Sequence, residues 1–203
     1  MDAAAAAVIP AMLNKGLAAR KQGVILLTAL MIACLVFPAC APVPTDKNPA
    51  NDVLEGDLYR NTKYGFSIVF PAGWQQGGSN SASVVRRAMN SKGHSVVIGV
   101  TELPLFTRFF TRDVEGVVKE DEIVKSMGEQ FEDFKLLDKG TAQVGGERAA
   151  WMKYSLSYMV RDKKSSMTLV VYNVLRSGIL YTLTVSDVPE AKSSVESFKF
   201  ENR

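Results

Sequence analysis

The sequence is poor in the side chains that most often carry catalysis or hold a metal. Its 203 residues include one histidine, His94, and two cysteines, Cys34 and Cys40. Metal sites and nucleophilic centres usually bring several such side chains together. His94 lies between two strand-like runs, with no second histidine or cysteine nearby, and is expected to be a turn residue. We therefore expect no metal, no cofactor and no catalytic residue.

Signature motifs of common enzyme classes are absent as well. No serine occurs in a G-x-S-x-G nucleophile elbow, and no glycine-rich phosphate loop follows a predicted strand. The acidic side chains of residues 120–133 lack the alternating ligand spacing of a calcium-binding EF-hand loop. We interpret them as the solvated face of a helix.

The residues after position 39 have no large net charge of one sign and no pair of cysteines that could form a disulfide. Residues 1–39 contain three of the 24 Lys and Arg and one of the 21 Asp and Glu, so the remainder carries 21 basic and 20 acidic side chains. Such a balance argues against nucleic-acid binding, which requires a basic stripe. Both cysteines lie at or before position 40, so the fold depends on its core. Residues 58–200 are numerous enough to form one domain.

What the chain does contain is an export signal. Lys15, Arg20 and Lys21 precede an apolar run over residues 24–37, which leads to Cys40. A cysteine after such a run resembles the lipobox of bacterial lipoproteins, in which the thiol receives diacylglycerol. The resemblance implies lipidation of Cys40.

The same resemblance divides the chain into a signal peptide, a lipidated flexible tether and a folded domain, over residues 1–39, 40–57 and 58–203. The tether contains proline and polar residues, as linkers between an anchor and a domain often do. Ala41 stands in place of the aspartate associated with inner-membrane retention in some bacteria. We therefore expect a lipid anchor in the cell envelope, on the periplasmic side of the outer membrane in a Gram-negative cell.

Other interpretations of this region stay open. Cys34 is a second candidate for lipidation, and residues 39–41 also fit the A-x-A pattern of ordinary secretory cleavage. Residues 24–43 are long enough to remain as an uncut membrane anchor, although prolines weaken the last turns. Met12 is an alternative start. All alternatives carry the folded domain across the inner membrane, because the basic residues stay inside.

Hydrophobic patterning predicts an α+β fold, with an antiparallel β-sheet flanked by helices. Strand-like runs occur at residues 58–60, 66–70, 84–89, 95–101, 135–144, 148–160, 167–175 and 179–185. Helices are predicted over residues 117–134 and 189–197, whereas residues 51–56 and 75–83 are expected to be linker and loop.

A motif that begins at Tyr64 reads Y-G-F-S-I-V-F-P-A-G-W. It is similar to the opening Y-G-F-x-I-x-x-P-x-x-W pattern of the PsbP-like superfamily, which includes photosystem accessory proteins, the bacterial lipoprotein DcrB and a Ran-binding nuclear-import factor. The run G-I-L-Y-T-L-T from Gly178 agrees with the same family. The resemblance covers residues 58–200 and implies a PsbP-like α/β/α sandwich. Its motifs are structural, so they imply little about function.

The least conventional segment is the connection over residues 103–112. Three phenylalanines in a connection cost free energy unless something covers their rings. In one interpretation, Leu105 and the three rings form a lid over the core. In the other, the segment is an apolar patch with a basic rim that contacts lipid headgroups or a partner protein. The partner-binding residues are then Phe106, Arg108, Phe109, Phe110 and Arg112.

These observations lead to one expected function and one alternative. We expect a non-catalytic accessory or binding module that is held at a membrane by its lipid anchor and docks on an envelope protein or complex. The alternative is a carrier of a small apolar ligand between sheet and helix, in a pocket lined by Met152, Tyr154 and Phe131. A filled core at that place would favour docking.

Overall fold

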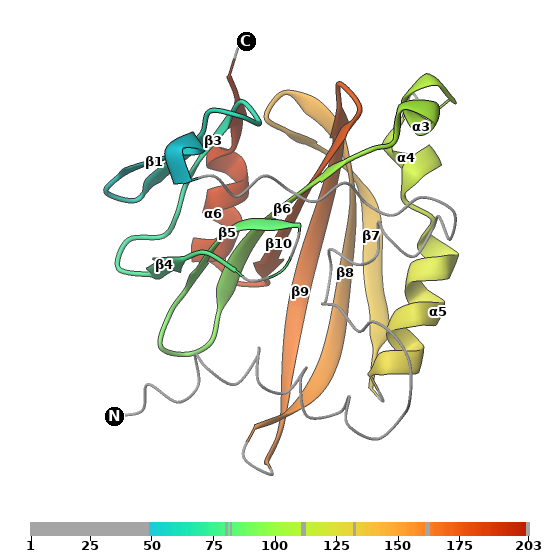
Figure 1. Ribbon diagram of the computed structural model, residues 1–203. Helices are drawn as coiled ribbons and strands as arrows, with labels where there is room; N and C mark the ends of the chain where they lie inside the picture. Colours follow the sequence, from blue (N-terminus) through green and yellow to red (C-terminus); the bar gives the residue numbers. More distant parts are fainter. Residues whose placement is uncertain are drawn as a thin grey trace.

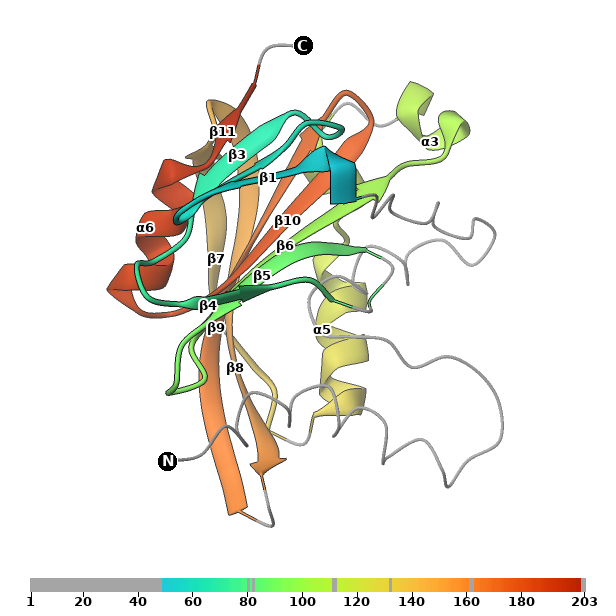
Figure 2. The same ribbon diagram turned by 60° about the vertical axis from the view of Figure 1, so that its left-hand side comes forward.

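The computed structural model of the protein describes residues 49–79, 81, 83–110, 113–131, 133–160 and 163–201. In this part of the chain, a large antiparallel sheet lies between a layer of helices and a second layer that contains a small sheet and one helix (Figures 1 and 2). The predicted α+β class, with an antiparallel sheet flanked by helices, is confirmed. Cys40 and the expected signal peptide lie outside the described residues.

The large sheet has seven strands in the order β4-β5-β6-β10-β9-β8-β7. They are β4 (Gln75–Gly77), β5 (Val84–Met89), β6 (Ser95–Glu102), β7 (Lys135–Val144), β8 (Glu147–Val160), β9 (Lys163–Arg176) and β10 (Ile179–Ser186). The strands predicted between residues 84 and 185 are confirmed, and β9 is longer than expected. The loop expected at residues 75–83 is wrong in its first part, where β4 pairs with β5. Gln75 and Gly77 carry no strand signal, so the pairing depends on the neighbouring strand.

The small sheet consists of β1 (Asp52–Glu55), β2 (Leu58–Asn61), β3 (Phe66–Val69) and β11 (Lys199–Phe200), and a short helix η2 (Pro49–Asn51) precedes it. The linker expected at residues 51–56 is therefore wrong. Residues 52–55 form β1 instead, and Asp52 accepts hydrogen bonds from two neighbours in β2, as described below. A carboxylate with such partners is stabilised in a strand that hydrophobic patterning does not reveal.

The helices are α3 (Leu105–Phe110), α4 (Val114–Val117), α5 (Glu120–Gln130) and α6 (Pro189–Ser197). The bounds predicted for α6 are confirmed. The single helix expected over residues 117–134 is wrong in its extent, because Val118 is extended and separates α4 from α5. The side chain of Asp113 accepts a hydrogen bond from the Gly116 N–H and caps α4. In Figure 1, α4 and α5 lie on one side of the large sheet and α6 on the other.

The main core fills the space between the large sheet and the layer formed by the small sheet and α6. Every residue of β10 is buried. Aromatic rings connect the two layers: the Phe66 ring lies 5.9 Å from the Tyr181 ring and 5.3 Å from the Phe198 ring, measured between centroids. Full burial of such a side chain contributes about 1.5–3 kcal/mol.

A second core lies under α5. Ile123 and Met127 of the helix pack against Met152 and Tyr154 of β8, which are 4% and 1% exposed. Phe131 is half-buried against the same cluster. Packed side chains thus occupy the place where the carrier alternative expected an open pocket.

Candidate functional site

The expected docking segment lies at one end of the large sheet. β6 ends at Glu102, and α3 begins at Leu105 (Figure 1). Leu105 is 71% exposed, so the lid interpretation is wrong for this residue. The structure does not describe Arg112 or the side chains of Phe106, Phe109 and Phe110. Their role in partner binding stays a prediction.

Arg108 fastens α3 to the turn between β9 and β10. Its Nε donates a hydrogen bond of 2.7 Å to the carbonyl oxygen of Leu103. The aliphatic part of the Arg108 side chain packs closely against Gly178. A Cβ at position 178 would lie only 2.5 Å from Arg108 Cδ, so a larger residue would clash there. The Leu103 N–H in turn donates to the Gly178 carbonyl at 2.9 Å. The arginine expected to bind a partner is thus also a support for the segment that carries it.

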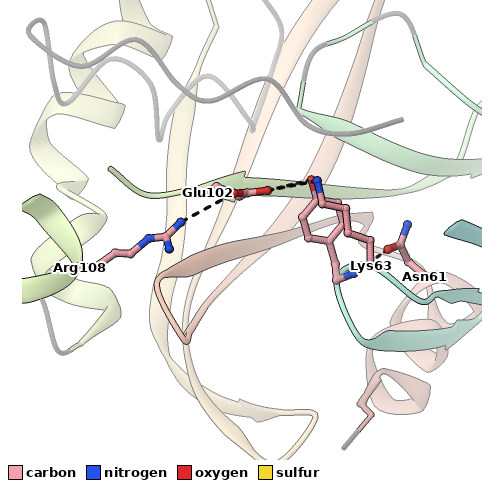
Figure 3. Close-up of polar contacts among 5 residues, drawn as sticks. Asn61, Lys63, Glu102 and Arg108 are labelled. Carbon is pink, nitrogen blue, oxygen red and sulfur yellow. Dashed lines mark hydrogen bonds and ion pairs between the residues drawn. The ribbon is translucent and has the colours of Figure 1, made fainter. Parts of the chain in front are cut away.

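Glu102 connects α3 with the turn between β2 and β3 (Figure 3). Its carboxylate accepts a hydrogen bond of 3.3 Å from the Tyr64 hydroxyl. It also lies 3.5 Å from Lys63 Nζ and 3.8 Å from Arg108 Nη2. These pairs are partly exposed, and each contributes at most about 1 kcal/mol. Together they fix the relative positions of two segments that are distant in the sequence.

Asn61 holds the β2–β3 turn in the shape that this contact requires. It is 1% exposed, and its Oδ1 accepts a hydrogen bond of 2.8 Å from the Tyr64 N–H. Its Nδ2 donates to Asp52 Oδ1 and to the Tyr59 hydroxyl, both at 3.1 Å. Burial is the largest cause of a raised pKa at Tyr59, so this phenol stays neutral and donates to Asp52 at 2.7 Å.

A pocket of about 310 Å³ adjoins the same turn. Its wall is formed by the β2–β3 turn, the β9–β10 turn and the C-terminal strand, through Tyr64, Gly65, Arg176, Ser177, Ile179, Tyr181, Phe200 and Glu201. The Tyr181 hydroxyl donates a hydrogen bond of 2.8 Å to the Tyr64 carbonyl and so closes the base of this region. The volume is near the lower limit of small-molecule sites.

Charged and aromatic side chains stand together in the pocket wall. The Arg176 guanidinium lies 4.6 Å from the centroid of the Phe200 ring, a cation–π contact. Its Nε is 3.5 Å from Glu147 Oε1. Glu201 accepts a hydrogen bond of 2.5 Å from Arg60 Nε, which offsets the charge of this carboxylate.

Within the described residues, no three His, Cys, Asp or Glu side chains are placed to bind a metal ion. In the same part of the chain, no helix combines the length and the apolar character that a membrane span needs. His94 lies in the β5–β6 turn, as expected, and its N–H donates to Asn90 Oδ1 at 3.0 Å. Its ring nitrogen Nδ1 is 3.3 Å from Asn90 Nδ2.

Sequence reasoning did not find Glu102, Lys63, Arg176 or the pocket. Glu102 meets Tyr64, a residue 38 positions earlier, and no local pattern marks such a contact. The Ser177-Gly178 turn is visible in the sequence, but its position beside the C-terminal strand is not.

The fold is similar to that of a known protein, the cyanobacterial PsbP (CyanoP) from Synechocystis, in its solution structure. The TM-score is 0.51 and the sequence identity 16%, over 73% of this chain and 95% of that chain. A crystal structure of a protein from Bacteroides thetaiotaomicron is similar at a TM-score of 0.42 and 10% identity, over 74% of this chain and 50% of that one. No protein-family model and no curated protein matches the sequence. The likeness to CyanoP confirms the PsbP-like fold.

Proposed function

We propose that this chain is a non-catalytic accessory module of the cell envelope, anchored by lipid at Cys40, that docks on an envelope protein through α3. The main observation behind this proposal is the exposure of Leu105. This large apolar side chain is 71% exposed on α3, a helix that the contacts of Arg108 and Glu102 hold in place. Exposed apolar side chains beside basic ones are common in protein interfaces.

The support of α3 favours binding because it lowers the entropy lost on association. Arg108 packs against Gly178 of the β9–β10 turn, and Glu102 contacts both Arg108 and Tyr64 of the β2–β3 turn. A surface that is already ordered loses less conformational freedom when a partner binds. A lipid anchor would add to this by concentrating the module at the membrane where the partner resides.

Two further observations support the proposal. The basic residues, apolar run and cysteine between Lys15 and Cys40 are typical of an exported lipoprotein. The PsbP-like fold, shared with CyanoP, is consistent with an accessory or binding module. The carrier alternative loses support because Met152 and Tyr154 are packed under α5.

Crosslinking in intact cells, followed by mass spectrometry, tests the docking surface. We expect Leu105→Glu to reduce capture of the main crosslinked protein at least about fivefold, since about 1 kcal/mol of apolar contact is lost. The control is Leu137→Glu, because Leu137 is also exposed, at 49%, but belongs to β7, which three strands separate from β6 in the large sheet. Equal capture by both variants would contradict docking through α3.

The anchor is tested separately. We expect Cys40→Ser to move the protein from the membrane fraction to the soluble fraction, and the native protein to carry the mass of attached acyl chains. An unmodified thiol in the native protein would contradict lipidation at Cys40. The docking experiment would still be valid in that case.

A further inference from the structure

The pocket between the β2–β3 turn, the β9–β10 turn and β11 contains a cation, Arg176, with unused hydrogen-bonding capacity. The distance of 3.5 Å between Arg176 Nε and Glu147 Oε1 is longer than a charge-assisted hydrogen bond, which is about 2.7–2.9 Å. The Phe200 ring holds the guanidinium from one side. A planar guanidinium in this position can donate two parallel N–H bonds to a carboxylate.

Ser177 is the second unusual feature of the pocket. Its φ is +52° and that of Gly178 is +73°, which are values of a type I′ turn between β9 and β10. Asn-Gly or Gly-Gly suits such a turn best, and a serine there costs about 1–3 kcal/mol. Residues in strained conformations cluster at binding sites. Here the strained residue lines the pocket, next to Arg176.

We propose that this pocket binds a carboxylate attached to a small apolar or aromatic group. The carboxylate accepts hydrogen bonds from Arg176 and Ser177, and the apolar part lies against the rings of Tyr64 and Phe200. A volume of about 310 Å³ admits a group of roughly the size of one amino-acid side chain or a small aromatic acid. The ligand is either a free small acid or an acidic side chain of a partner protein. This inference goes beyond docking through α3.

Two acidic side chains near the pocket affect its affinity for a carboxylate. Glu201 lines the pocket but is paired with Arg60, so its repulsion of a ligand carboxylate is reduced. Glu147 competes with the ligand for Arg176. Glu147→Gln should therefore tighten binding by about two- to fivefold, the value expected for release of a partly exposed ion pair.

The test is a titration of the full chain with phenylacetate, followed by two-dimensional NMR of the backbone amides. We expect saturable shifts at Ser177 and Phe200, with phenylacetamide binding at least about tenfold more weakly because it lacks the charge. Arg176→Gln should abolish the shifts, and Arg148→Gln on β8, paired with Glu115 outside the pocket, is its control.

Several results would overturn the proposal. They are equal binding of acid and amide, shifts that survive Arg176→Gln, and no gain in affinity in Glu147→Gln. The affinity of Glu147→Gln remains a test even if Arg176→Gln fails to fold. A purely structural role of Glu147 does not predict tighter binding of phenylacetate in this variant. Tighter binding of phenylacetate than of N-acetyl-phenylalanyl-glutamate amide identifies a free acid as the ligand, and the reverse identifies a protein side chain. Leu105→Glu should leave both affinities unchanged, which separates this site from docking.

Discussion

Two buried tyrosines show how the surroundings of a hydroxyl decide its effect on stability. The Tyr59 hydroxyl donates to Asp52 and accepts from Asn61. The Tyr154 hydroxyl, under α5, is buried and has no hydrogen-bond partner among the described residues. Burial raises the pKa of both phenols, so both are neutral at physiological pH. A buried polar group without a partner keeps its desolvation cost, whereas a paired one does not.

Removal of each hydroxyl should therefore have opposite effects. We expect Tyr154→Phe to leave the free energy of unfolding unchanged or to raise it by up to about 1 kcal/mol. Tyr59→Phe should lower it by about 1–3 kcal/mol, because Asp52 and Asn61 lose a buried partner. Urea titrations of both variants measure the difference. A clear loss of stability in Tyr154→Phe would mean that its hydroxyl has a partner in solution.

At the scale of elements, α5 contains a glycine that its packing does not require. In the described part of the chain, no heavy atom outside the helix backbone lies within 4 Å of a Cβ added at Gly128, and α5 covers the core through other residues. Glycine inside a helix costs about 0.5–1 kcal/mol relative to alanine. The helix propensity of α5 is thus lower than it would be with alanine at this position.

Gly128→Ala should raise the free energy of unfolding by about 0.5–1 kcal/mol. Gly140→Ala in β7 is the control, because its added Cβ would lie only 3.1 Å from Trp151 Nε1. Thermal unfolding of the two variants should show a higher Tm for the first and no increase for the second. A lower Tm in Gly128→Ala would mean that the exposed side of α5 is covered in solution.

A second prediction at this scale concerns the attachment of α6 to the large sheet. Asp187, directly after β10, lies 2.5 Å from Lys153 of β8 and 2.5 Å from Lys192 of α6. The hydrogen bonds from Lys153 and then Lys192 hold the pKa of Asp187 below its ordinary value of 3.8. A lowered pKa in the folded state stabilises the fold above the unfolded-state pKa, and this contribution is lost as the pH falls through the folded-state value.

Asp187→Asn should accordingly lower the Tm at pH 7, and the difference from the wild type should shrink as the pH falls below about 4. Glu129→Gln on the exposed side of α5 is the control. A difference in Tm that stays constant between pH 7 and pH 3 would show that the ion pairs do not determine the effect.

At the scale of the whole molecule, the ends of the described chain meet in one core. β11, near the C-terminus, pairs with β3, and Gly145 of the β7–β8 turn bridges to Lys199. Phe198 is 1% exposed and stacks on Phe66. Both sheets share these contacts, so neither sheet can unfold alone without exposing the core of the other.

Phe198→Ala should therefore lower the free energy of unfolding by about 3–5 kcal/mol, the usual cost of deleting a buried ring. Its thermal transition should remain single, with equal midpoints by far-UV circular dichroism and by fluorescence of Trp74 and Trp151. Both tryptophans pack against the main core. Separate midpoints would show that the two sheets unfold independently.

Most of the framework could be predicted because local patterns carry it. The alternation along β8, the turn residues around β9 and β10, and the short helix α6 are visible in the sequence. The strands β1 and β4 could not be predicted, because each has only three or four residues and pairs with a neighbouring strand that supplies its hydrogen-bond partners. The single helix predicted over residues 117–134 is too long, because the backbone is extended at Val118 before α5 and at Phe131 after it.

The amino-acid sequence by itself determined the class of fold and the order of most elements, since hydrophobic periodicity and turn chemistry act over a few residues. The prediction of an export signal likewise depends on consecutive residues alone, without any tertiary contact. The tertiary structure alone decided which side chains meet at the end of the sheet. Tyr64 and Glu102 are 38 residues apart in the sequence, and Arg176 and Phe200 come from two separate strands. Contacts across such separations depend on the packing of whole layers, and no short stretch of sequence encodes them.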